Sequence, residues 1–375
     1  MKVIEPQMLK ILHTKASAQG VPLSGTFELS PCCNMNCRMC YVRKSREEVL
    51  MAGGERSVVQ WISLAEEAYR SGMLFLLLTG GEPFLYPDFR KLYEELSSMG
   101  IVLSINTNGT LIDEDTVSWL KDRAPSRVNV TLYGASRETY GRLCQNPDGF
   151  DRTIHSIKML KEAGINVKLN ASMTPYNIMD LDEIYQLAES MSVYVQATSY
   201  MYPPVRKDER NIGMGDRFSA AEAGRWQTAI DRKRMTEEQF IARAEAIKKN
   251  QLLVPDDDCV RNDSEPLRCR AGRSSFWINW KGEMTPCGLM VKPAAYPIRD
   301  GFLHAWEQVR EQTMMIRLPK KCSNCKKKTV CSVCGASVLA ETGDFAEVPE
   351  YLCEMTDELI KTTVSVNMEK GDKEH

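Results

Sequence analysis

The chain has 375 residues, of which 43% are hydrophobic, so there is room for one large domain and a smaller one. A formal net charge of -2 at pH 7 gives no overall attraction to nucleic acid. No run approaches the roughly 20 apolar residues of a membrane span, and residues 1–24, an N-terminal extension, do not resemble a signal peptide. We therefore expect a cytoplasmic protein without nucleic-acid or membrane partners.

Short runs typical of strands alternate with amphipathic stretches between residues 25 and 199. We expect strands at residues 25–30, 73–79, 101–107, 127–133, 165–172 and 193–199. Helices are expected between them at residues 58–71, 88–99, 113–122, 150–163 and 181–190. This alternation indicates an α/β fold built from parallel βαβ units. By itself the pattern leaves a partial barrel and a doubly wound sheet open.

The pattern changes after residue 199. Residues 200–258 read as a helical connecting region, in which the clearest helix is at 236–250. Residues 259–366 hold eight cysteines among short β-like pieces such as 275–280, and 367–375 are expected as a flexible tail. A small cysteine-dense module usually lacks a sufficient apolar core and is stapled by metal or disulfides.

Three cysteines follow the first expected strand in C-x3-C-x2-C spacing: Cys33, Cys37 and Cys40. Iron-sulfur clusters are normally held by four cysteines, so three on one loop suggest that a small molecule completes the set. Zinc with Cys32 as the fourth ligand is an alternative, but adjacent cysteines rarely reach around one tetrahedral ion. A disulfide framework is typical of small secreted chains and does not suit this one.

At this loop the chain resembles the radical S-adenosylmethionine (SAM) superfamily. The resemblance implies a partial (β/α)6 TIM-like barrel and a [4Fe-4S] cluster on the three cysteines, whose open iron binds SAM. It also implies an enzyme that reductively cleaves SAM to a 5′-deoxyadenosyl radical, which abstracts hydrogen from a substrate carbon.

Further motifs stand at the ends of the next expected strands, where α/β barrels place their chemistry. The resemblance assigns Gly80-Gly81-Glu82-Pro83 to the amino group of SAM, and an ordinary Gly-Gly turn is the alternative. The other SAM-binding residues that it implies are Tyr41, Asn106, Asn108, Thr131 and Arg142.

Two further residues near these motifs are not explained by the family pattern. Tyr133 occupies a position where relatives often carry an aspartate, so the role of that acid is not carried over. Cys144 is a candidate hydrogen-atom donor, and an inert buried thiol is the alternative.

The second half resembles the SPASM extension of peptide-modifying radical SAM enzymes. The resemblance implies one auxiliary [4Fe-4S] cluster on Cys269, Cys287 and Cys334, with Cys259 as a plausible fourth ligand. It implies another on Cys322, Cys325, Cys331 and Cys353, which makes three clusters in all. The spacing C-x2-C-x5-C-x2-C alone would equally suit zinc.

The resemblance favours a peptide or protein substrate that is crosslinked, epimerised or oxidised. Its implied partners are a separate leader-recognition protein and a flavodoxin- or ferredoxin-type reductant. A radical SAM enzyme acting on a small molecule or tetrapyrrole is the alternative. From another class, an iron-sulfur electron carrier or a zinc-stapled binding protein stays open, although neither needs the barrel or the Gly-Gly-Glu-Pro motif.

Overall fold

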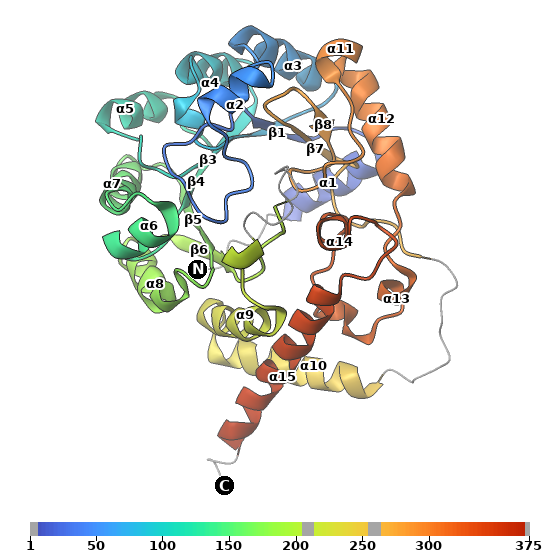
Figure 1. Cartoon of the computed structure of the whole chain (residues 1–375). Coiled ribbons are helices and arrows are strands. Elements are labelled where there is room, and N and C mark those ends of the chain that lie inside the picture. The colour runs from blue at the N-terminus through green and yellow to red at the C-terminus, as the bar shows by residue number, and fades with distance from the viewer. Residues whose placement is uncertain (1–6, 205–213, 254–263, 372–375) are drawn as a thin grey trace.

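A central sheet in the order β6-β5-β4-β3-β2-β1-β7-β8 organises the molecule (Figure 1). The computed structural model describes residues 7–204, 214–253 and 264–371. Its strands are Ser24–Glu28 (β1), Phe75–Thr79 (β2), Val102–Thr107 (β3), Arg127–Thr131 (β4), Val167–Ser172 (β5), Tyr194–Thr198 (β6), Ser275–Ile278 (β7) and Met284–Thr285 (β8). All neighbours from β6 to β7 are parallel, and β8 is antiparallel to β7.

Most helices of the first half form an arc outside this sheet, and the last helices of the chain lie below it (Figure 1). Those of the first half are Gln7–Gln19 (α1), Arg46–Met51 (α2), Val58–Arg70 (α3), Phe89–Ser98 (α4), Glu114–Asp122 (α5), Arg137–Cys144 (α6), Gly149–Glu162 (α7) and Leu181–Ser190 (α8). Those of the second half are Ala220–Arg234 (α9), Glu237–Leu253 (α10), Pro297–Asp300 (α11), Phe302–Met315 (α12), Lys320–Ser323 (α13), Gly335–Thr342 (α14) and Glu350–Gly371 (α15). The partial barrel predicted from the sequence is confirmed.

The sheet extends beyond the six expected strands. Strand β7 pairs in parallel with β1, with Gly25 opposite Phe276 and Phe27 opposite Ile278. Phe276 of β7 packs against Phe302 of helix α12, and the centroids of the two rings are 5.1 Å apart. The first part of the expected cysteine-rich module therefore completes the barrel sheet. Helix α15 also runs to Gly371, into the segment expected as a flexible tail.

The two faces of the sheet differ in character. Side chains alternate between faces along a strand, and those pointing to the outer helices form the main core, as Phe27, Leu78, Ile105 and Val130 do at 0% exposure. The alternate residues face the barrel interior, and many of them are polar. Thr26, Ser104, Asn106, Asn129, Lys168, Asn170 and Gln196 are on this inner face. The interior is therefore suited to a polar or charged ligand.

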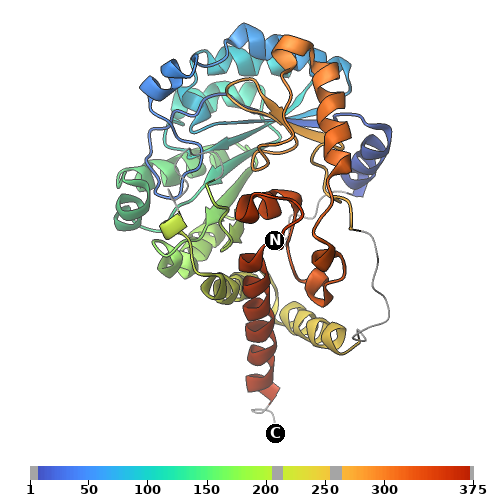
Figure 2. The ribbon, with the colours of Figure 1, turned by 45° about the vertical axis from the view of Figure 1, so that its right-hand side comes forward.

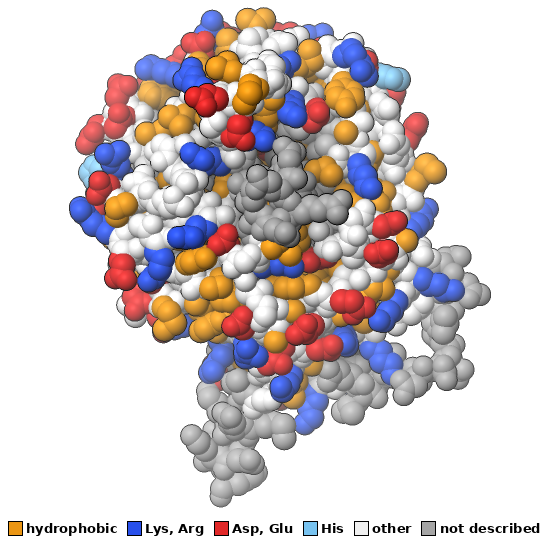
Figure 3. Space-filling model, viewed as in Figure 1, with side chains coloured by type: hydrophobic (Ala, Val, Ile, Leu, Met, Phe, Trp, Pro, Cys, Tyr) orange, Lys and Arg blue, Asp and Glu red, His pale blue; other side chains and the backbone are white. Residues whose placement is uncertain are grey.

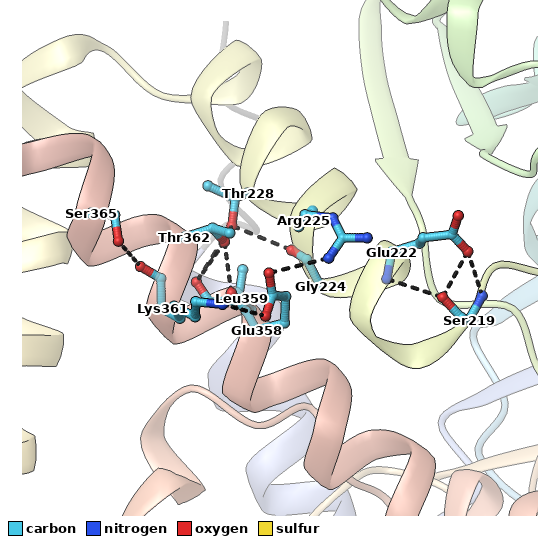
Figure 4. Close-up of polar contacts among 10 residues, drawn as sticks. All are labelled: Ser219, Glu222, Gly224, Arg225, Thr228, Glu358, Leu359, Lys361, Thr362 and Ser365. Atoms are coloured by element: carbon cyan, nitrogen blue, oxygen red, sulfur yellow. Dashed lines mark hydrogen bonds and ion pairs between the residues drawn. The ribbon is translucent and has the colours of Figure 1, made fainter. Parts of the chain in front are cut away.

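Helices α9 and α15 lie side by side below the barrel in both ribbon views (Figures 1 and 2). Gly224 allows the close approach, since a Cβ there would lie 2.4 Å from the carbonyl oxygen of Met355. Figure 4 shows the polar contacts around it: Arg225 Nη1 lies 3.2 Å from Glu358 Oε1, and the hydroxyls of Thr228 and Thr362 are 2.7 Å apart. This pairing ties the C-terminal helix to the connecting region.

A second contact joins the connecting region to α14. Arg217 forms a buried ion pair with Glu341, 2.8 Å from Nη1 to Oε1, and its guanidinium lies 4.0 Å from the Tyr351 ring centroid. The Tyr200 hydroxyl donates to the same Glu341 oxygen at 2.9 Å. The segment after β6 and helices α14 and α15 are thus held together by one cluster of side chains.

On the face seen in Figure 3, acidic and basic side chains are interspersed. Nothing on this face resembles the single-sign basic stripe of a nucleic-acid-binding protein. Among the described helices, none combines the length and the apolar character needed to cross a membrane.

Candidate active site

The cysteine loop begins where β1 ends and is folded by its own backbone. Cys40 N–H donates to the carbonyl of Cys37 at 3.1 Å. Two thiols accept backbone hydrogen bonds, Cys33 from Met35 N at 3.4 Å and Cys40 from Arg43 N at 3.3 Å. Burial raises the pKa of the Cys33 thiol to about 12, and the nearby Cys37 and Cys40 thiols add to the rise. Three thiols gathered on one loop, two of which act electrostatically on the third, suit a positively charged metal centre.

The Gly80-Gly81 turn after β2 packs directly on this loop. A Cβ at Gly80 would lie 2.5 Å from the carbonyl oxygen of Ser30, and one at Gly81 would lie 2.4 Å from that of Cys32. Gly81 N–H donates to Ser30 O at 2.7 Å, and Glu82 N–H donates to Cys32 O at 2.9 Å. In this structure the glycines are therefore needed for contact with the cysteine loop, whereas the sequence suggested contact with a ligand.

Glu82 links the ends of β2 and β3 from a fully buried position. Its Oε1 accepts from Thr107 Oγ1 at 2.8 Å and from Phe84 N at 3.2 Å, and its Oε2 accepts from Asn108 N at 2.8 Å. Burial raises the pKa of the Glu82 carboxyl to about 7, while these three hydrogen bonds oppose the rise. The carboxylate fixes the backbone around the cysteine loop. Whether it also meets the SAM amino group stays a prediction.

Asn108, which follows the last residue of β3, connects this strand to the cysteine loop by hydrogen bonds. Its side-chain amide donates to Asn34 Oδ1 at 2.9 Å and approaches Cys33 Sγ at 3.7 Å. Thr110 completes the network, because its hydroxyl donates to Asn108 Oδ1 at 2.6 Å and accepts from Asn34 Nδ2 at 2.7 Å. The sequence pointed to Asn108 and missed Asn34 and Thr110, because neither shows its partner in local spacing.

The C-terminal end of α6 supports the other side of the loop. Carbonyl oxygens of Leu143 and Cys144 accept from the backbone N–H groups of Arg38 and Asn36, at 3.1 and 3.0 Å. The Cys144 thiol is fully buried and hydrogen-bonded to Cys37, which raises the pKa of Cys144 well above its usual value. A thiol in this position is poorly placed to reach a substrate, so the geometry favours support of the loop over hydrogen-atom donation.

Tyr133 also reaches this group, because hydrogen bonds from Cys144 and, to a smaller extent, from the Tyr133 hydroxyl lower the pKa of Cys37. The tyrosine that replaces an expected aspartate therefore lies beside a cysteine of the triad. Its role could not be read from the motif, since the contact depends on how β4 and the cysteine loop pack.

The remaining residues expected at SAM are distributed around the same edge of the sheet. Arg142, on α6, contacts Glu138, Thr139 and the carbonyl of Tyr176, 3.0 Å from its Nε. Asn106 accepts from Asn129 Nδ2 at 2.8 Å, on the inner face. Thr131 ends β4, and Tyr41 lies half-buried in the cysteine loop. Their contacts with SAM stay predictions.

The structure brings three of the later cysteines together around Tyr202. Burial raises the pKa of the Cys287 thiol to about 11, and Cys334 and Cys269 raise it further. The Tyr202 hydroxyl lies 3.6 Å from Cys334 Sγ. Cys259, the fourth ligand expected here, lies outside the described residues.

The other four cysteines surround a separate cavity of about 230 Å³, which all of them line: Cys322, Cys325, Cys331 and Cys353. Burial raises the pKa of the Cys322 thiol to about 11, with further rises from Cys353, Cys331 and Cys325. Among the later cysteines, those described thus fall into two groups, divided as the sequence predicted apart from Cys259, which is not described. Ligation of clusters by them stays a prediction.

Within the described ranges, no three histidine, cysteine or acidic side chains converge as they would around a single metal ion.

Known proteins with the same elements were found by three comparisons. The profile of the Radical SAM superfamily matches residues 27–188. The AdoMet-dependent heme synthase of Methanosarcina barkeri is 25% identical over 338 residues, which cover 87% of this chain and 94% of that protein. The subtilosin biosynthesis protein AlbA of Bacillus subtilis is 25% identical over 313 residues, covering 82% and 64%.

Among solved structures, the fold is similar to that of Streptococcus suis SuiB bound to precursor peptide SuiA. The TM-score is 0.65 at 18% identity, and the match covers 94% of this chain and 82% of SuiB. At this identity the likeness shows the shared fold.

Proposed function

We propose that this chain, in which residues 27–188 match the Radical SAM superfamily, reductively cleaves SAM and uses the resulting 5′-deoxyadenosyl radical to abstract hydrogen from a carbon of a peptide or protein. The observation that carries the proposal is the convergence of three strand ends. The cysteine loop after β1 is held by Glu82 after β2 and by Asn108 at the end of β3. An electron carrier would have no need of this assembly.

Cys33, Cys37 and Cys40 would hold a [4Fe-4S] cluster. When bound, the cluster supplies the electron that SAM cleavage requires and an iron with an open position for SAM. The chain's own contribution is hydrogen bonding, since backbone N–H groups reach two of the thiols and the Asn108 amide approaches Cys33. Such outer contacts orient ligands and adjust the electron density of a metal centre.

The residues that would bind SAM are those assigned from the family pattern. Gly80 to Pro83 would bind the amino group of SAM. Arg142 would bind its carboxylate and would then give up its hydrogen bond to Glu138. The others are Tyr41, Asn106, Asn108 and Thr131.

The later cysteines would hold two auxiliary [4Fe-4S] clusters. Cys269 and Cys334 lie close enough to Cys287 to raise the pKa of its thiol. These three would be ligands of one cluster, and Cys259 would be the fourth. Cys322, Cys325, Cys331 and Cys353 would form the other set around their common cavity. These clusters would relay or accept electrons, supplied in the cell by a flavodoxin- or ferredoxin-type protein.

A peptide substrate is supported by the relatives. SuiB, with the same fold, has been solved with its precursor peptide, and AlbA takes part in bacteriocin biosynthesis. A separate leader-recognition protein would deliver such a peptide. A tetrapyrrole substrate is the second candidate, because the heme synthase of M. barkeri matches this chain over 94% of its own length.

Anaerobic reconstitution tests the proposal. Protein reduced with dithionite should release 5′-deoxyadenosine from SAM, and iron and sulfide near twelve each per chain would agree with three clusters. A panel of candidate peptides and a carboxylated porphyrin then separates the two substrate classes by mass spectrometry. Absence of 5′-deoxyadenosine with every substrate would overturn the enzymatic proposal.

A further inference from the structure

The inner wall of the barrel carries a row of polar side chains across β3 to β6. Asn106 is in register with Asn129, and Asn129 with Lys168, so the three share one face at one level. Asn129 Nδ2 donates to Asn106 Oδ1 at 2.8 Å, and Lys168 Nζ donates to Gln196 Oε1 at 2.7 Å. Asn129 itself is 7% exposed. The row therefore runs from the buried Asn129 through the half-buried Lys168 to the exposed Gln196.

Two cations belong to this wall. Lys168 is one, and Arg127, two residues before Asn129 on the same face of β4, is the other. Burial, and then repulsion from Arg127, lower the pKa of Lys168 to about 8, and among the described residues no carboxylate opposes these two effects. Glu28, an acid on the opposite wall, accepts a hydrogen bond from Trp277 Nε1 at 3.1 Å.

Two polar atoms of this wall are buried without a hydrogen-bond partner among the described residues, Arg127 Nε and Asn129 Oδ1. Partly buried like charges without a counter-ion cost free energy, as do buried polar atoms that form no hydrogen bond. Such a cost is offset when a ligand brings a negative charge and hydrogen-bonding atoms to the same place. The wall is therefore better suited to a complex with an anion than to the free protein.

An apolar hollow adjoins the cations. It is a cavity of about 260 Å³. The residues from the inner face of the sheet that line it include Thr26, Phe75, Leu77, Val102, Ser104 and Trp277. Ser104 is the register partner of Arg127, so the hollow reaches the cationic wall. A ligand that fits both parts has an apolar body and an acidic group.

We propose that Arg127 and Lys168 form a carboxylate-binding subsite inside the barrel, which anchors a substrate with an apolar body. The inference rests on the proposed function and specifies its substrate, because carboxylates are the acidic groups that peptides and tetrapyrroles carry. Arg127 begins β4 and the cysteine loop lies at the opposite ends of the strands. At about 3.3 Å per residue, the bound carboxylate would stand on the order of 10 Å from the carbon that reacts.

Equilibrium dialysis of the reconstituted protein with SAM provides the test. The probes are two matched pairs, coproporphyrin III with its tetramethyl ester, and a Leu-Glu repeat peptide with its Leu-Gln counterpart. We expect the wild type to bind one acid at least about tenfold more tightly than its neutral partner. The pair that shows the preference identifies a tetrapyrrole or a peptide as the source of the carboxylate.

Variants locate the preference. Lys168→Gln should remove most of it and Lys168→Arg should retain it, because arginine keeps the charge. Lys158→Gln, an exposed lysine on the outer helix α7, is the matched control and should leave the preference unchanged. Equal binding of acid and neutral probes by the wild type, or an equal effect of the two glutamine variants, would overturn the subsite. If Lys168→Gln unfolds, the wild-type comparison decides alone.

The release of 5′-deoxyadenosine by the wild type is measured in parallel without either probe. Its absence would count against the proposed function, whereas its presence without an acid preference would count against the subsite alone.

Discussion

The barrel and the cysteine-rich region are stabilised in different ways. Between the sheet and helices α3 to α8, a continuous core buries large side chains such as Trp61, Phe27 and Tyr93 completely. Around the later cysteines, the separate buried cluster consists of Leu267, Met290, Ala336 and Leu339. Apolar burial is the main favourable term in folding, so we expect the barrel to depend less on metal than the second region does. The second region depends on its cysteines and on contacts with neighbouring helices.

The first way to sharpen this comparison separates activity from folding. Cys37→Ala should lower 5′-deoxyadenosine formation by more than about 100-fold, because loss of a cluster ligand exceeds the effect of outer-sphere changes. The barrel should still fold, since most of its core lies between the sheet and the outer helices. Activity assays and thermal unfolding check both parts. Cys32→Ala is the control, and equal activity of both variants would contradict the assignment of Cys37.

The second tests whether the cysteine-rich region depends on metal. Cys325→Ala should raise amide exchange in α13 and α14 by about 100-fold, or roughly 3 kcal/mol of local stability. Strands β2 and β3 should keep their protection, because their core is unchanged. Hydrogen-exchange mass spectrometry of the reconstituted protein measures both. Uniform deprotection of the whole chain would show that the two regions fold as one unit.

The third prediction concerns the contact between α9 and α15, the helix that contains Cys353. Gly224→Ala should destabilise the protein by about 1–2 kcal/mol, because the new Cβ would meet the Met355 carbonyl at 2.4 Å. Gly141→Ala in α6 is the matched change, since its Cβ would meet only ordinary contacts at 3.6 Å. We expect it to stabilise by about 0.5–1 kcal/mol through helix propensity. Denaturant unfolding compares them, and effects of the same sign would refute the packing argument.

The smallest expected effect comes from removing a helix N-cap, and the same change can be made in both regions. Ser57 caps α3 of the barrel and Ser219 caps α9, each within a capping box. Replacing either by alanine should cost about 1 kcal/mol. Ser219→Ala should in addition loosen α15, which exchange of that helix would report, whereas Ser57→Ala should leave α15 unchanged. A loosened α15 in both variants would mean that the barrel itself sets the stability of that helix.

Much of the barrel was predictable from the chain because its signals are local. The six strands and the helices between them follow from periodicity, and the structure has β3 at Val102–Thr107 where residues 101–107 were expected. The cysteine spacing and the Gly-Gly-Glu-Pro motif likewise predicted the match of residues 27–188 to the Radical SAM superfamily before any contact was known. Local propensity and global fold agree here, as they do in chains with a well-defined native state.

Other features needed the tertiary structure. The parallel pairing of β7 with β1 joins segments separated by the whole barrel, so no local pattern contains it. The buried contacts of Cys144 and Tyr133 with Cys37, and the cationic wall of Arg127 and Lys168, arise because neighbouring strands stand in a particular register. The sequence alone indicated the six strands of the partial barrel, most of the helices between them, the resemblance to radical SAM enzymes and the candidate cluster ligands. Which side chains meet inside the barrel was decided by long-range packing, since it depends on residues far apart in the chain.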